Sequence, residues 1–222
     1  MLISIKNNFM NKLAFISQSG NVMKSTLATA TALEAIKNDI NVAVADLDVE
    51  HRTITSWVKQ REEYDISPIF KVYPVNSAIE AINCFNNEQL CIIDAPSRAT
   101  SATVEIASVS NLIIQPVPPS KKDLDLAINT FAQLSQKGIH LKKMVFIITR
   151  VGSNSELQKA TNYLNLAQIE GQSIKVLDSP IWEKVGYRSA VNDGLAITET
   201  AFPTLNEGAK SVIHQMLTLL IK

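Results

Sequence analysis

The stretch from Leu13 to Thr26 constrains the fold most, because it predicts a strand, a polar loop and a helix start in succession. Residues 13–16 form an apolar run typical of a buried strand, and the polar segment Ser17–Met23 follows. Lys24 then opens a helical pattern whose apolar residues share one face: Leu27, Ala30, Leu33 and Ile36. Backbone N–H groups at a helix N-terminus bind phosphate, and an adjacent lysine and hydroxyl serve the outer phosphates and Mg²⁺. The stretch therefore predicts a phosphate site.

This loop departs from the strict phosphate-loop pattern. The pattern G-x-x-x-x-G-K-[ST] has glycine at the two positions where this chain has Gln18 and Met23. A Lys-Ser pair also begins helices that bind no nucleotide. The prediction of a nucleotide site therefore depends on what the rest of the chain supplies.

Composition restricts the class of protein. The chain has 222 residues, 46% apolar and 19% charged, which is ordinary for a soluble globular domain with a substantial core. Its formal net charge is zero, so no global field favours nucleic acid or a membrane. The two cysteines, Cys84 and Cys91, lie in apolar runs without metal-ligand spacing and indicate reduced thiols of a cytoplasmic protein. The three histidines are scattered and suggest no metal site or catalytic triad: His51, His140 and His214.

Apolar strands alternate with helical patterns along the chain. The predicted strands are 13–16, 42–45, 69–73, 90–94, 111–115, 144–149 and 173–177. The predicted helices begin at Lys24 and cover 51–63, 77–85, 102–108, 121–137, 155–166 and 204–221, while 178–199 is left unassigned. Near-continuous apolar strands between helices predict an α/β fold, with a doubly wound, mostly parallel sheet flanked by helices. We expect one domain over residues 1–222, with residues 1–10 as either a disordered segment or an additional N-terminal extension.

Aspartates follow two of the predicted strands. Asp46 and Asp48 end the second strand, and Asp94 ends the fourth. Because ligands of such sheets bind at the carboxyl ends of strands, these side chains converge with Lys24 if the strands are neighbours. Phosphoryl transfer needs a carboxylate on the Mg²⁺ side and a group that orients water. Each aspartate alone also fits a simple cap or turn residue.

Several motifs in order resemble one family. Residues 19–26 are similar to the deviant Walker A box of the ParA/MinD ATPases, and 45–50 to the second, D-x-D box. Residues 92–96 resemble the Walker B strand and loop, and 114–120 the proline-containing loop after the fifth strand. The ending 187–199, followed by a helix, resembles small plasmid-partition ParA proteins. The resemblance implies a P-loop NTPase-like fold with ATP and Mg²⁺ as cofactors.

The resemblance also implies a role for each site residue. Lys24 would bind the β- and γ-phosphates, and Thr26 the α-phosphate. Ser25 would ligate Mg²⁺, and Asp94 would hold it through water. Asp48 would orient or activate the hydrolytic water, with Asp46 supporting it. The implied nucleotide-binding set is Gly20, Asn21, Val22, Met23, Lys24, Ser25 and Thr26.

Partners follow from the same resemblance. Family members form a homodimer around ATP, the dimer binds non-specific DNA or a membrane, and an adaptor such as a ParB-like protein stimulates hydrolysis. Candidate DNA contacts are Lys121, Lys122, Lys142, Lys143, Arg150, Lys184 and Arg188, each of which also fits solvated surface charge. Membrane binding is not expected, because the last helix carries little charge beyond Lys210 and Lys222. We expect a cytoplasmic protein that partitions a plasmid or chromosome, associated with the nucleoid if it binds DNA.

The departures keep alternatives open. The family's signature lysine is Ser19 here, and Met23 stands where the family has glycine. We therefore expect a weak, partner-stimulated ATPase. One alternative is a non-hydrolysing scaffold or regulator, and another is a carboxysome-type cargo-positioning relative lacking the signature lysine. Lysines that could replace it are Lys121, Lys122 and Lys159. A small-molecule kinase is a third alternative, although no lid insertion is recognisable.

Overall fold

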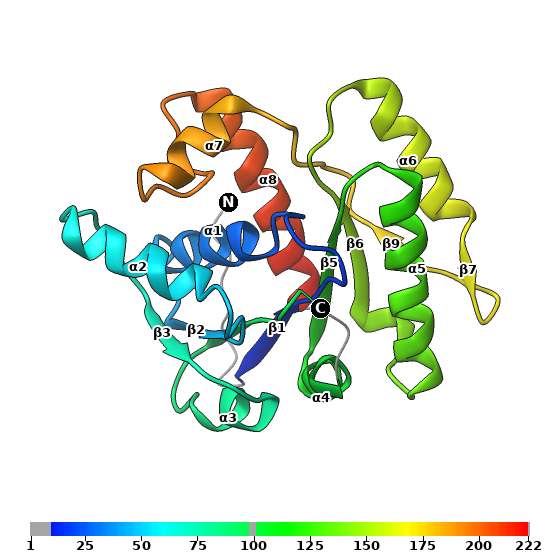
Figure 1. The fold of residues 1–222 in the computed structure, drawn as a ribbon, viewed down its shortest axis with the longest axis horizontal. Helices are drawn as coiled ribbons and strands as arrows, with labels where there is room; N and C mark the ends of the chain where they lie inside the picture. Colours follow the sequence, from blue (N-terminus) through cyan, green and yellow to red (C-terminus); the bar gives the residue numbers. More distant parts are fainter. Residues whose placement is uncertain (1–9, 98–100, 222) are drawn as a thin grey trace.

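A seven-stranded sheet forms the centre of the computed structural model, which describes residues 10–97 and 101–221 (Figure 1). The strands run β3-β2-β4-β1-β5-β6-β9 across the sheet, and every neighbouring pair is parallel. This arrangement confirms the predicted fold class. The expected N-terminal extension lies outside the described residues except for Met10, and the domain limits of 1–222 stay a prediction.

The elements of the sheet and its flanking helices alternate along the chain. The strands of the sheet are β1 Asn11–Phe15, β2 Val42–Asp46, β3 Lys71–Pro74, β4 Leu90–Asp94, β5 Leu112–Val117, β6 Met144–Ile148 and β9 Lys175–Val176. The helices are α1 Lys24–Ile36, α2 Thr53–Glu63, α3 Ala78–Asn83, α4 Ser101–Val109, α5 Lys121–Gln136, α6 Asn154–Leu166, α7 Val185–Asn192 and α8 Pro203–Leu220. A short 3₁₀ turn, Leu141–Lys143, precedes β6.

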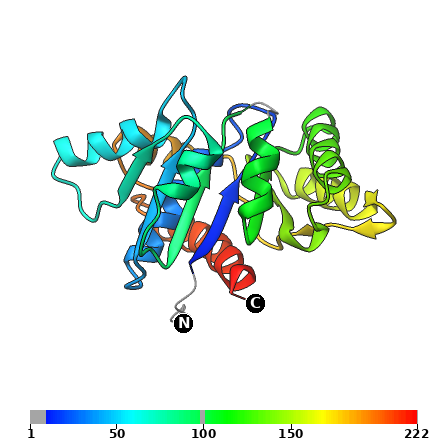
Figure 2. The ribbon, with the colours of Figure 1, turned by 90° about the horizontal axis from the view of Figure 1, so that it is seen from below.

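Helices cover both faces of the sheet (Figure 2). One core contains buried side chains of α1, α2, α7 and α8, and the other contains those of α3, α4, α5 and α6. The strands supply both, since successive side chains point to opposite faces: Leu13 and Phe15 enter the first core, and Ala14 enters the second. Burial on both faces explains why the strand sequences are continuously apolar.

The order of the central strands places the candidate site. β4 lies between β1 and β2, and Asp94 pairs in register with both Phe15 and Asp46. The chain crosses from β1 to β2 on one side, while β5 pairs with β1 on the other side. The carboxyl ends of β1, β4 and β2 therefore meet where the strand order changes direction, as the sequence predicted.

The sequence was least informative after residue 166. Residues 173–177 were predicted as one strand, but only β9 joins the sheet. Gln168–Ile169 (β7) and Gln172–Ser173 (β8) form an antiparallel hairpin instead. Its two turn residues, Glu170 and Gly171, have φ of 52° and 73°, as in a tight type I′ turn. The unassigned segment 178–199 contains α7.

No helix among the described residues is both long and apolar enough to cross a membrane.

Both cysteines are free thiols, as the sequence indicated. Burial raises the pKa of Cys84 to about 11 and that of Cys91 to about 12. Since the thiolate is the reactive form, neither side chain is poised for nucleophilic chemistry.

Candidate functional site

The loop between β1 and α1, which we call the phosphate loop (Ser17–Met23), ends in a left-handed residue. Met23 has φ 72° and ψ 22° and stands directly before the first residue of α1. No side chain among the described residues caps this helix, so its first-turn N–H groups are not occupied by a capping oxygen. A helix start of this kind favours an anion.

Lys24, Ser25 and Asp94 meet below the loop. The Lys24 Nζ lies 3.0 Å from Asp94 Oδ1, and the Ser25 hydroxyl donates to Asp94 Oδ2 at 2.6 Å. Both charged side chains are almost fully buried, with 4% and 0% exposed. Burial raises the pKa of the Asp94 carboxyl above its ordinary value, although Lys24 and Ser25 act in the opposite direction. The structure therefore brings the predicted phosphate lysine, metal hydroxyl and metal-side carboxylate together.

A cavity of about 390 Å³, the phosphate cavity, opens over these groups. All seven residues of the predicted nucleotide-binding set, 20–26, line it, together with Ser19, Asp48, His51, Thr53 and Ser97. A second cavity of about 240 Å³ shares Asn21, Met23 and Thr26 with it and adds Trp182 and Tyr187. A polar chamber thus adjoins a partly aromatic one, which fits a ligand with an anionic end and a planar end.

Asp46 and Asp48 have different surroundings. The fully buried Asp46 carboxylate accepts hydrogen bonds from the backbone N–H (3.0 Å) and hydroxyl (2.8 Å) of Thr55. Its other oxygen accepts from the backbone N–H of Asp48 at 3.2 Å. Asp48 itself lines the phosphate cavity. Asp46 therefore ties the start of α2 to β2 and positions Asp48, while Asp48 is the carboxylate that a ligand can reach.

Two residues after β6 hold the phosphate loop, and the sequence analysis missed this function. The Thr149 hydroxyl donates to the Val22 carbonyl at 3.1 Å, and the Arg150 guanidinium donates to the Asn21 carbonyl at 2.9 Å. Arg150 also donates to Glu183 at 2.8 Å. The available signal in the sequence was the change from apolar to polar residues at the end of the predicted strand 144–149, where side chains can face a ligand site. Because Arg150 already bonds to the loop and to Glu183, its guanidinium group would have to leave these partners to contact DNA.

At the position of the family's signature lysine, the structure has a neutral contact. The Ser19 hydroxyl donates to Asp123 Oδ1 at 3.0 Å. Asp123 also receives the Ser120 hydroxyl at 2.5 Å, and its backbone N–H donates to Ser120 Oγ at 3.2 Å, which caps α5. A carboxylate, not a cation, therefore lies beside this part of the loop.

The predicted basic residues fall into two groups. Lys121, Lys122, Arg150, Lys184 and Arg188 follow strands at the carboxyl edge of the sheet, whereas Lys142 and Lys143 precede β6 at the opposite edge. Several are already engaged. Lys121 pairs with Asp125 at 2.8 Å, Lys143 donates to the Ser110 carbonyl at 3.0 Å, and Arg188 pairs with Glu183. One flat surface does not present all seven side chains.

Comparison with known proteins supports a nucleotide site on this fold. The family profile of the CobQ/CobB/MinD/ParA nucleotide binding domain matches residues 13–197. No curated protein matches the sequence significantly.

Solved structures match over nearly the whole chain. A putative plasmid partition protein from Borrelia burgdorferi B31, bound to AMPPNP, is 14% identical, with a TM-score of 0.69 covering 93% of this chain and 99% of that one. An ATP complex of an aspartate-to-alanine variant of McdA from Cyanothece is 16% identical, with a TM-score of 0.71 over 96% of this chain and 98% of that one. The MinC:MinD cell division protein complex of Aquifex aeolicus is 14% identical, with a TM-score of 0.69 covering 94% of this chain and 96% of that one. At these identities the likeness shows the shared fold.

Proposed function

This chain belongs to the CobQ/CobB/MinD/ParA nucleotide-binding family, and from this premise we propose that it binds ATP with Mg²⁺ and hydrolyses it weakly. The observation that carries the proposal is the contact of Lys24 and Ser25 with Asp94 beneath the phosphate cavity. Relatives of the same fold have been solved with AMPPNP and with ATP, which supports the choice of ligand.

Phosphate binding would use groups already present at the start of α1. Free first-turn N–H groups favour the negative charge of phosphates, and the Thr26 side chain lies at the junction of the two cavities. Lys24 now pairs with the Asp94 carboxylate. A phosphate oxygen offers the ammonium group a second anionic acceptor in the phosphate cavity, so the lysine would turn toward the β- and γ-phosphates.

The residues present fit a magnesium ion. No cluster of three or more His, Cys, Asp or Glu in the described part of the chain could hold a metal alone, so phosphate oxygens and water would complete the coordination. Ser25 would supply the hydroxyl ligand, and Asp94, already 2.6 Å from that hydroxyl, would accept hydrogen bonds from metal-bound water. When bound, Mg²⁺ neutralises charge that develops on the phosphates. Asp48, at the cavity wall, would orient the attacking water.

A partition or positioning cycle is the cellular role that we propose. ATP would favour a homodimer, the dimer would bind non-specific DNA, and an adaptor protein would stimulate hydrolysis. The MinC:MinD relative is seen in complex with a partner protein, which supports the adaptor. Among the basic residues at the carboxyl edge of the sheet, Lys122 and Lys184 fit a DNA contact best, because ion pairs engage Lys121, Arg150 and Arg188 but neither of these two in the described part of the chain.

A scaffold or regulator that binds ATP without turnover is the second candidate. Met23 keeps its side chain at φ 72°, and the Asp123 carboxylate contacts Ser19, the residue at the position of the family's signature lysine. Both features oppose the usual arrangement of a hydrolysing dimer. A cargo-positioning relative without the signature lysine would combine these features with turnover, using Lys122 or Lys159, whereas Lys121 is held by Asp125.

Calorimetric titration of Mg²⁺–ATP into the wild type and Lys24→Ala tests the proposal, with Lys210→Ala as an exposed-lysine control. We expect binding by the wild type and the control, and loss of binding by Lys24→Ala. Light scattering of the same samples should show a dimer only with ATP. Absence of binding by the wild type would refute ATP as the ligand, and a saturated monomer would refute the dimer cycle.

A further inference from the structure

We propose that His51 is the residue that accepts the proton of the attacking water, with Asp48 orienting its ring. This inference rests on the proposed ATP hydrolysis and assigns the base in that same site. In the sequence the three histidines are scattered, and no motif indicates a function for His51.

The structure pairs His51 with Asp48. The ring Nδ1 lies 3.1 Å from Asp48 Oδ1, and the backbone N–H of His51 donates to the same oxygen at 3.2 Å. The backbone N–H of Arg52 donates to the Asp48 carbonyl at 2.7 Å, which closes the turn. The local turn therefore fixes the Asp48 carboxylate, and the ring contacts that carboxylate through Nδ1.

This pairing decides which nitrogen of the ring carries the proton. An ionised carboxylate only accepts hydrogen bonds, so Nδ1 must be the protonated nitrogen. Nε2 then keeps its lone pair, and no hydrogen bond from the described residues engages it. A carboxylate that orients an imidazole in this way is the usual arrangement of an Asp–His general base.

The ring is also the water-accessible member of the pair. The His51 side chain is 65% exposed, whereas that of Asp48 is 11% exposed. His51 lines both the phosphate cavity and an adjoining open cavity of about 730 Å³. The other charged groups that line these two cavities are Lys24, Asp48 and Glu50. The imidazole thus lies at the boundary between the phosphate cavity and the larger adjoining cavity.

The proposed step balances without a further reactant. Water oxygen forms a bond to the γ-phosphorus, and the bond from that phosphorus to the β,γ-bridging oxygen breaks, with its electron pair leaving on ADP. The proton of the water moves to Nε2 of His51 while Nδ1–H stays hydrogen-bonded to Asp48. The imidazolium then returns its proton to solvent.

The test combines ATP binding with turnover in three variants. His51→Gln can donate to Asp48 but cannot accept a proton, His51→Ala removes both functions, and His140→Gln changes an exposed histidine far from the site. We expect His51→Gln to lower kcat about 100-fold while ATP affinity, measured by calorimetry, stays within about twofold. Added imidazole should restore part of the turnover of His51→Ala, which a purely structural function would not allow.

The outcomes separate this inference from the proposed function. Wild-type turnover by His51→Gln, or no rescue of His51→Ala by imidazole, overturns the assignment of His51 while ATP hydrolysis stands. A wild type that binds ATP without hydrolysing it overturns the assignment and favours the scaffold. A wild type that binds no ATP overturns the proposed function itself.

Discussion

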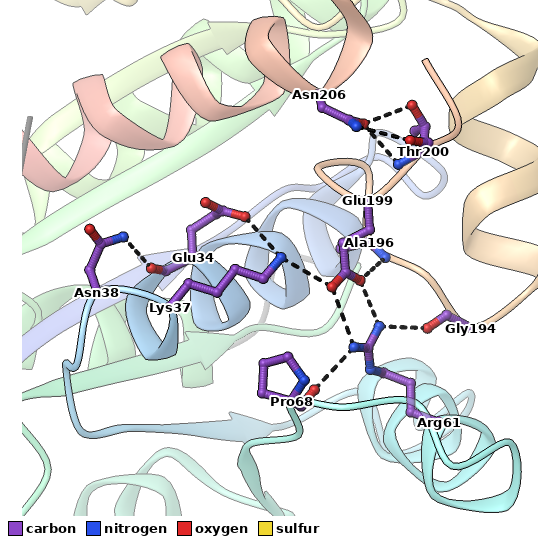
Figure 3. Close-up of polar contacts among 10 residues, drawn as sticks. All are labelled: Glu34, Lys37, Asn38, Arg61, Pro68, Gly194, Ala196, Glu199, Thr200 and Asn206. Carbon is purple, nitrogen blue, oxygen red and sulfur yellow. Dashed lines mark hydrogen bonds and ion pairs between the residues drawn. The ribbon is translucent and has the colours of Figure 1, made fainter. Parts of the chain in front are cut away.

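Two buried ion pairs in this protein look alike in distance but differ in their surroundings. Lys24–Asp94 lies at the phosphate loop with a separation of 3.0 Å, and Arg61–Glu199 joins α2 to the segment before α8 with a separation of 2.7 Å. The first pair has few partners and borders a cavity. The second belongs to a dense polar network (Figure 3).

Arg61 donates through both terminal nitrogens of its guanidinium group, while its buried Nε has no hydrogen-bond partner among the described residues. It is completely buried and donates to the Gly194 carbonyl at 2.9 Å and the Pro68 carbonyl at 3.1 Å in addition to Glu199 (Figure 3). Glu199 in turn receives Lys37 at 3.1 Å and the backbone N–H of Ala196 at 3.0 Å. The pair and its hydrogen bonds join α2 to the C-terminal segment, and removal of Arg61 would leave the Glu199 carboxylate without its main partner.

The pKa shifts of the two carboxyls point in opposite directions. Burial raises the pKa of Asp94, and its few partners do not offset it. Burial also acts to raise the pKa of Glu199, but hydrogen bonds from Arg61, Ala196 and Lys37 lower it below its ordinary value overall. The comparison teaches that a buried pair held by many further partners serves the fold, whereas a pair with few partners beside a cavity is suited to exchanging partners with a ligand.

Breaking the Arg61–Glu199 pair should have the largest effect. Arg61→Met leaves Glu199 without its main partner, so the free energy of unfolding should fall by about 3–5 kcal/mol. Urea denaturation measures this change. Lys59→Met, an exposed position on the same helix, should alter it by less than about 0.5 kcal/mol. Equal effects of the two substitutions would mean that the network does not stabilise the fold.

Breaking the other pair should damage binding more than stability. Lys24→Met removes a charged contact to phosphate, so ATP affinity should fall roughly 10- to 100-fold. The accompanying loss of unfolding free energy should be smaller than for Arg61→Met, because Asp94 has a raised pKa and can become neutral by taking a proton. Calorimetry and urea denaturation measure the two quantities. A larger stability loss than in Arg61→Met would reverse the comparison.

Acid should weaken the network through Glu199. Its pKa is lower in the folded state than the ordinary value of 4.5, so the unfolded chain binds more protons and stability rises with pH in this range. The contribution is complete above the unfolded pKa and disappears as pH falls through the folded pKa. Unfolding free energy should therefore decline more steeply in the wild type than in Glu199→Gln between about pH 5 and pH 3. Parallel curves would show that Glu199 has no part in acid stability.

The smallest effect should come from the loop backbone. Met23 has φ 72°, a conformation that costs a non-glycine residue about 1–2 kcal/mol. Glycine removes this strain, but it also makes the unfolded chain more flexible, which offsets part of the gain. Met23→Gly should raise the unfolding free energy by at most about 1 kcal/mol and strengthen ATP binding. Thermal unfolding and calorimetry measure both. Asn21→Gly, at φ 61°, is the matched control, and its unfolding free energy should change less, since asparagine tolerates this conformation. Lower ATP affinity in Met23→Gly would contradict the expected gain in binding.

Most of the fold followed from local patterns. Apolar runs with the period of strands and helices located β1 to β6 and their helices within a few residues, because burial on both faces leaves a direct imprint on sequence. The aspartates at strand ends could be assigned to one site, because parallel strands place their carboxyl ends at the same edge. The hairpin β7–β8 and helix α7 were missed, because short elements with mixed polarity leave no periodic pattern.

The sequence by itself determined the sheet, its helices and the Lys24-centred loop, since hydrophobic periodicity and helix-start chemistry act between residues close in the chain. Only the tertiary structure decided which distant groups hold that loop and close the fold. Thr149 reaches Val22 across 127 positions, and Arg61 reaches Glu199 across 138. Such contacts depend on how helices and strands pack in three dimensions. The sequence does not indicate which distant acceptor a hydroxyl or guanidinium group will contact, because that contact forms only when the elements pack together.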